Sequence, residues 1–171
     1  PADREAASTR CGRVDIIFEN FLGAFIRRRG SRRDMAHAMT VLEDAQAYTI
    51  EWDEDLDIPV FTWDEYTAGD EFRETAREWE AVMERRGAER YIVNTESVTA
   101  HDDADKRWLA ETWVPDLVDI GVRYGAGVYA DSAIASMEME EVEESMSAVH
   151  PDYEFRVFPS NEEAKAWLRD R

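Results

Sequence analysis

The chain has 171 residues, 39 of them Asp or Glu and 20 Lys or Arg, so its formal net charge is −19. This length allows one domain with a real core plus an appendage, and six Trp, seven Phe and six Tyr supply the large apolar side chains that a disordered chain lacks. A single cysteine excludes an internal disulfide and a multi-cysteine metal site. Without any apolar run of about 18 residues, the chain is expected to be soluble and cytoplasmic.

The excess of acidic residues indicates the salt environment of the protein and does not indicate a reaction. Repulsion among so many carboxylates is screened at molar salt, where the Debye length is roughly 3 Å, so the composition is typical of a halophilic protein. A strongly negative chain also repels phosphate backbones, and we therefore expect no nucleic-acid partner. Because carboxylates form the expected surface here, a group of them is weak evidence for a metal site.

An N-terminal segment, residues 1–38, differs in charge from the rest. Its first 34 residues carry a net charge of +3, which leaves −22 for the remainder. Apolar residues in it recur at the spacing of one helix face: Val14, Ile17, Phe18, Phe21, Leu22, Phe25 and Ile26. The pattern predicts an amphipathic helix, followed by an Arg-rich run that ends at Arg33.

Three interpretations of that segment stay open at the level of sequence. The helix and basic run over residues 14–33 contact an anionic membrane surface or a second copy of the chain, or the helix packs on its own domain. Alternatively, the segment is an artefact of the start site, because the acidic composition begins near Met35 and Met39.

The order of strand and helix patterns along residues 39–171 predicts one α/β domain. Its sheet is expected to be mixed and mostly parallel, with about five strands and four covering helices. Apolar alternation or short buried runs indicate strands over residues 47–52, 58–62, 91–93, 122–129 and 153–158. Helical periodicity indicates helices over residues 67–86, 105–118, 131–149 and 160–168. The first two strands are expected to pair as a hairpin around an acidic turn.

Local signals refine these elements. Thr67 with Asp70, and Ser160 with Glu163, have the spacing of capping boxes at helix starts. Pro115 either kinks the second helix or starts another short one. Gly residues at 125 and 127 allow close approach to the backbone of their strand, or a bulge in it.

The element order resembles that of STAS-type domains, and more closely the short, stand-alone STAS/SpoIIAA-like proteins of haloarchaeal type. The resemblance covers roughly residues 48–169. It rests on that order and on these residues: Trp108, Trp113, Pro115, Gly121, Val157, Phe158, Glu162, Glu163, Ala164, Trp167 and Leu168. It implies a non-catalytic module that binds a partner protein or a second copy of itself, with no cofactor.

One branch of that family is switched by phosphorylation of a hydroxyl where the third strand meets the second helix. The resemblance therefore makes Ser97 and Thr99 candidate phosphoacceptors, although the family's usual Asp-Ser-Ser/Thr-Gly stretch is absent here. Neighbouring carboxylates oppose a further negative charge at this position, so the same hydroxyls are also expected to serve as helix caps.

Two other functions stay open. The first is a small-molecule or lipid-binding module with an apolar pocket between helices and sheet, lined by Trp or Met. The second is a metal-dependent enzyme around His101, with Asp102, Asp103 and Asp105 as further ligands. A separate hypothesis places Trp52 and Trp63 at strand ends, where exposure of both would mark a binding patch.

Overall fold

The computed structural model describes residues 38–98, 102–129 and 141–171. All of them belong to the second of the two units into which the chain divides, Met35–Arg171. The amphipathic helix and basic run predicted over residues 14–33 fall outside the described residues. Within the described part, no helix is long and apolar enough to cross a membrane.

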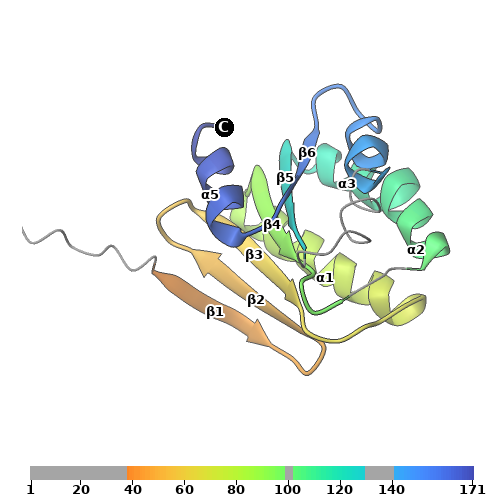
Figure 1. Cartoon of the computed structure of the whole chain (residues 1–171), viewed down its shortest axis with the longest axis horizontal. Coiled ribbons are helices and arrows are strands. Elements are labelled where there is room, and N and C mark those ends of the chain that lie inside the picture. The colour runs from red at the N-terminus through yellow and green to blue at the C-terminus, as the bar shows by residue number, and fades with distance from the viewer. Residues whose placement is uncertain (1–37, 99–101, 130–140) are drawn as a thin grey trace, which may run out of the picture. The chain divides into compact units, whose positions relative to one another are not determined.

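The centre of the fold is a six-stranded mixed sheet whose strands lie in chain order (Figure 1). The first two pairings are antiparallel and the last three are parallel. Its strands are β1 (Met39–Asp44), β2 (Tyr48–Asp53), β3 (Ile58–Trp63), β4 (Arg90–Asn94), β5 (Tyr124–Val128) and β6 (Glu154–Phe158). The predictions of an α/β class, a hairpin of β2 with β3 and a parallel remainder are confirmed.

The strand order explains where the helices lie. Each crossover from β3 to β6 advances by one strand in the same direction, and right-handed crossovers then place every connecting helix on the same face. Figure 1 shows α1 (Asp70–Arg86), α2 (Asp103–Trp108) and α3 (Val114–Asp119) on that side, and residues 141–147, which are also helical, pack there. The last helix in the described residues, α5 (Asn161–Arg169), covers the opposite face.

Alternation along the strands divides the core between these two faces. Tyr48, Ile50 and Trp52 of β2 point toward the connecting helices, where the larger core cluster lies. On the other face, a smaller cluster that includes Ile58 and Val60 of β3 packs against α5. The apolar residues of the sheet are therefore buried on both sides, as expected for parallel strands between helices.

The edge strand β1 was not predicted. Its pairing with β2 shifts register between Val41 and Glu43, so a bulge at this point breaks the apolar alternation that identifies a strand. Val41 is 56% exposed, and most of the strand faces solvent. Strand formation here depends on β2 as a template, which a local pattern cannot show.

The two predicted capping boxes have different outcomes. Ser160 caps α5 as predicted, because its Oγ accepts a hydrogen bond from the Glu163 N–H at 3.3 Å. The box at Thr67 is wrong: α1 begins with Gly69 as its N-cap, at φ 63°, and has no side-chain cap. The Gly69 N–H instead donates to Asp105 Oδ2 at 2.7 Å, so a distant carboxylate secures this helix start.

Pro115 lies where a widened helical turn leads into α3 (Val114–Asp119). A π-helical turn over Leu109–Trp113 separates α2 from α3, and Pro115 stands in the first turn of α3. Since proline has no N–H, the ordinary helical bond from residue 115 to residue 111 cannot form, and the N–H of Val114 instead donates to the Leu109 carbonyl. The widened turn contributes side chains to the cavity described below.

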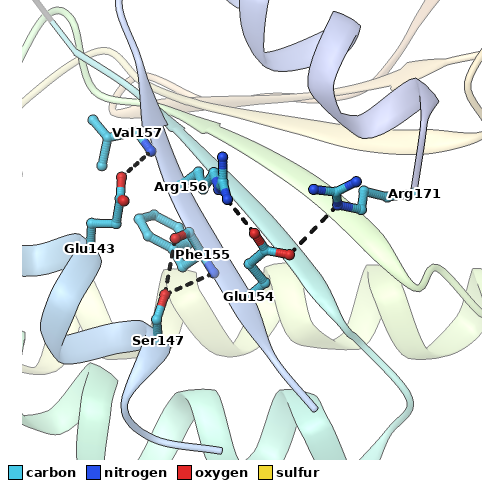
Figure 2. Close-up of polar contacts among 7 residues, drawn as sticks. All are labelled: Glu143, Ser147, Glu154, Phe155, Arg156, Val157 and Arg171. Carbon is cyan, nitrogen blue, oxygen red and sulfur yellow. Dashed lines mark hydrogen bonds and ion pairs between the residues drawn. The ribbon is translucent and has the colours of Figure 1, made fainter. Parts of the chain in front are cut away.

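The outer edge of β6 is occupied by side chains of the preceding helix. Figure 2 shows Ser147 Oγ accepting from the Phe155 N–H at 3.1 Å and donating to the Phe155 carbonyl at 3.0 Å. Glu143 Oε2 accepts from the Val157 N–H at 2.9 Å. These contacts satisfy backbone groups that a bare edge strand leaves open, and they fix the helix of residues 141–147 against the sheet.

Candidate functional site

A cavity of about 520 Å³ lies between the sheet and the helices on its larger core face. Side chains of β3, β4, β6 and α1 line it together with α2, the π-helical turn and the helix of residues 141–147. Much of this lining is aromatic or aliphatic, and it includes Trp63, Trp79, Trp113 and Met146. A concave, mainly apolar space of this size is the usual form of a small-molecule site.

The glycines of β5 make room for the aromatic floor of this cavity. A Cβ on Gly125 would stand 2.7 Å from Phe155 Cδ2 and from Tyr153 Oη, and 2.8 Å from Tyr91 Cζ. A Cβ on Gly127 would stand 2.7 Å from Tyr129 Oη. The close approach predicted for these glycines is thus made by aromatic rings, which lie over the strand where side chains would otherwise stand.

Three tyrosines gather over β5. Tyr91 Oη and Tyr153 Oη are 2.7 Å apart, and Tyr129 lies over Gly127. Burial raises the pKa of Tyr153 and Tyr129, and it raises the pKa of Tyr91 although the hydrogen bond from Tyr153 opposes the shift. All three groups are therefore neutral phenols at physiological pH, suited to hydrogen bonding with an uncharged group.

Charged residues mark where the cavity opens to solvent. Asp103, Arg107, Glu111 and Glu141 line it and are exposed, and half-buried Lys106 stands beside them. Lys106 Nζ lies 3.6 Å from Asp103 Oδ1. Three acidic and two basic side chains at this opening have a net charge close to −1, so the opening shows no excess of positive charge for an anion.

Trp52 and Trp63 do not form an exposed patch. They are 2% and 3% exposed, which contradicts that hypothesis. The Trp52 indole N–H donates to Asp57 Oδ1 at 3.2 Å, and Arg86 lies 4.5 Å from its ring centroid. Trp63 stacks on Phe72 at 5.2 Å and lines the cavity. Packing of α1 against the hairpin, which the position of these residues at strand ends does not indicate, buries both.

The loop after β4 holds one of the two candidate phosphoacceptors. Ser97 is exposed in a tight turn in which the Val98 N–H donates to the Thr95 carbonyl at 2.9 Å. Thr95 fixes this turn on the end of β5, since its N–H and its Oγ1 both donate to the Val128 carbonyl. Thr99 lies outside the described residues, and phosphorylation of Ser97 stays a prediction.

The carboxylates proposed as metal ligands have separate structural roles. Asp102 Oδ1 accepts from the Ala104 N–H and caps α2, and exposed Asp103 pairs with Lys106. Buried Asp105 accepts from Gly69 and from Arg73 Nε at 3.0 Å. His101 is outside the described residues, among which no group of three or more His, Cys, Asp or Glu is placed to hold a metal ion.

Sequence analysis gave an apolar pocket only as one of several alternative functions. The clearest sign of the cavity in the sequence is the spacing of two glycines. Gly125 and Gly127 are two residues apart in one strand and so share a face, and rings of Tyr91, Phe155 and Tyr129 approach them. Periodicity alone assigned the tryptophans to the core and did not show that the core is hollow. In comparisons with family models, curated proteins and solved structures, no match to this chain was found.

Proposed function

We propose that this chain is a binding module for a small, mainly apolar molecule, which occupies the cavity between the sheet and the helices. The observation that carries the proposal is the cavity itself, about 520 Å³ in volume and lined by three tryptophans and Met146. Transfer of an apolar ligand from water into such a space is favourable by roughly 25 cal/mol per Å² of apolar surface that is buried. The buried phenols of the lining, Tyr91 and Tyr129, are neutral and can form hydrogen bonds with a polar group of such a molecule.

A dye and a cavity-filling substitution test this proposal. N-phenyl-1-naphthylamine is uncharged, apolar and fluorescent when removed from water, and we expect saturable binding to the intact chain. Ala110 lines the cavity, so Ala110→Phe should weaken dye binding by about tenfold or more, a loss of about 1.4 kcal/mol. Fluorescence titration in molar KCl provides the measurement.

Ala166→Phe is the matched control. Ala166 is an exposed residue of α5 outside the cavity lining, so the same substitution there should leave dye affinity unchanged. Thermal melting checks that both variants are folded. Absence of saturable binding, or equal affinity in the two variants, would exclude the cavity as the site.

A protein-interaction role, which the STAS-type resemblance implies, is the second proposal and is supported by β1. This strand is at the end of the sheet and pairs only with β2 among the described strands, whereas side chains occupy the outer edge of β6. Addition of an extended segment to a free edge is a common mode of protein recognition. We propose a second copy of the chain as the partner, joined through β1.

The mass of the chain in solution tests this second proposal. Light scattering during size-exclusion chromatography should show a dimer for the intact chain and a monomer for Val41→Lys, because a charge at an exposed edge position disfavours strand pairing. A monomer for the intact chain at all accessible concentrations would reject it. The result is independent of dye binding, so the two proposals are tested separately.

A further inference from the structure

The hydroxyl of Tyr129 is a polar group of the cavity lining that has no hydrogen-bond partner among the described residues, and the indole N–H of Trp79 is another. Tyr129 follows β5 directly, and its N–H donates to the Phe158 carbonyl at 3.4 Å. Its side chain turns back over Gly127, where a Cβ would stand 2.7 Å from Oη and 2.8 Å from Cε2. The absent side chain at Gly127 thus places a phenol in the cavity lining.

This hydroxyl differs from the other buried phenols. Tyr91 and Tyr153 hydrogen-bond to each other, and the single proton of the Tyr48 hydroxyl is shared between the carboxylates of Glu43 and Glu78. Tyr129 is 8% exposed, and among the described residues its hydroxyl makes no hydrogen bond. Buried tyrosine hydroxyls usually have a partner, so this hydroxyl in the cavity lining is available to a group that a bound molecule would supply.

The surroundings determine which partner suits this donor. Burial, and then Tyr91 and Glu143, raise the pKa of Tyr129, so the phenol keeps its proton and donates it in a hydrogen bond. The nearby Glu143 carboxylate repels an anionic acceptor. The charged residues at the cavity opening add no excess of positive charge, and the chain as a whole carries −19.

We infer that the cavity takes a neutral, mainly apolar molecule that carries a carbonyl-type hydrogen-bond acceptor, and that Tyr129 Oη donates to this acceptor. The inference rests on the proposed small-molecule function and narrows it to one ligand class. A ligand without the acceptor leaves the phenol unpaired, and a site built around a hydrogen bond discriminates against such a ligand.

Two probes of nearly the same shape test the inference. 2-Acetylnaphthalene carries a ketone, whereas 2-ethylnaphthalene has no acceptor of that kind. We expect the intact chain to bind the ketone about tenfold more tightly, the factor that one net hydrogen bond supplies. A third probe, 2-naphthoate, carries a negative charge and should bind less tightly than the ketone. Equilibrium dialysis with each probe measures the affinities.

Tyr129→Phe removes only the hydroxyl. This variant should lose the preference for the ketone and keep its affinity for 2-ethylnaphthalene. The matched control is Tyr124→Phe, which removes a phenol hydroxyl from β5 itself on the opposite face, where Tyr124 packs with the α5 cluster, and should keep the preference. Thermal melting establishes that both variants are folded.

The outcomes separate this inference from the function on which it rests. If none of the probes binds the intact chain, the proposed small-molecule function fails. If the ketone and 2-ethylnaphthalene bind with equal affinity, or the preference survives in Tyr129→Phe, the role of Tyr129 is overturned while cavity binding stands. Tighter binding of 2-naphthoate than of the ketone would overturn the assignment of a neutral ligand.

Discussion

Two glycines in β5 determine the shape of the cavity floor. Gly125 and Gly127 lie on the helix-facing side of a parallel strand, where a side chain would normally fill the space between sheet and helix. Without a Cβ at these positions, the rings of Phe155, Tyr91 and Tyr129 approach the strand backbone. Two positions of the strand therefore carry no side chain, and aromatic rings line the space that remains above them.

Gly125→Ala is expected to destabilise the fold. The added Cβ would meet Phe155, Tyr153 and Tyr91 at 2.7 to 2.8 Å, and three packed rings cannot all move aside without strain. Overpacking of a core costs about 2 kcal/mol, which should appear as a lower urea midpoint in equilibrium unfolding. An unchanged midpoint would mean that the rings can repack, and that the glycines are not required for packing.

At the scale of elements, one ion pair attaches α5 to the hairpin of β2 and β3. Lys165 Nζ of α5 lies 2.8 Å from Asp53 Oδ2, and Asp53 is fully buried. The other oxygen, Asp53 Oδ1, accepts from the N–H groups of Asp55 and Leu56 in the hairpin turn. Burial alone would raise the pKa of Asp53, but these hydrogen bonds and the Lys165 charge lower it.

Lys165→Met should destabilise the fold by about 3 kcal/mol, because it leaves a buried carboxylate without its cation. Urea unfolding at neutral pH measures the loss. Lys165→Arg is the matched comparison, since it keeps the charge, and should retain more of the stability. A Lys165→Met variant as stable as the parent would show that α5 is held by its apolar contacts alone.

The pH dependence of stability tests the same pair. Since the folded-state pKa of Asp53 is lowered, its contribution is fully present above the unfolded value of about 3.9. It is lost as the pH falls below that value and through the lower folded pKa. In Lys165→Met the Lys165 charge no longer lowers this pKa, so acid removes less stability through Asp53 than in the parent. The stability difference between parent and variant should therefore be largest at neutral pH and shrink as the pH falls below about 3.9. Urea unfolding of both proteins at several pH values measures the difference, and a difference that does not change with pH would contradict this account.

For the whole molecule, the charge of −19 predicts a fold that is more stable in salt. The Debye length shortens from about 10 Å at 0.1 M to about 3 Å at 1 M ionic strength, so repulsion among surface carboxylates is largely screened. The melting temperature should therefore rise as KCl increases over this range. Thermal melting at several KCl concentrations, under otherwise identical conditions, tests it.

A variant with three fewer charges is the control for this salt effect. Glu84→Gln, Asp119→Asn and Glu144→Gln alter exposed residues and leave the cavity lining intact. Their combination should melt at a higher temperature than the parent at low salt and gain less from added KCl. Equal salt dependence of the two proteins would assign the effect to something other than carboxylate repulsion.

Local patterns in the sequence determined most of the fold. The helical periodicity of residues such as Phe72, Ala76 and Trp79 predicted α1, and short apolar runs predicted β2 to β6 within a few residues of their observed bounds. These patterns depend only on residues that are close together in the chain, so they can be recognised without knowledge of the tertiary contacts. The mixed, mostly parallel character of the sheet followed from the alternation of strands with helices, whereas the order of its strands was not predicted.

Only the tertiary structure decided the features that depend on contacts between distant segments. β1 forms because β2 offers it a partner, and the start of α1 is held by Asp105 from another helix. Packing of α1 buries Trp52 and Trp63, which were considered as a possible exposed patch. The cavity likewise depends on how rings from β3, β4 and β6 meet above two glycines. Sequence periodicity tells which side of an element faces inward, but the space left between elements is set by the sizes and positions of all their side chains together.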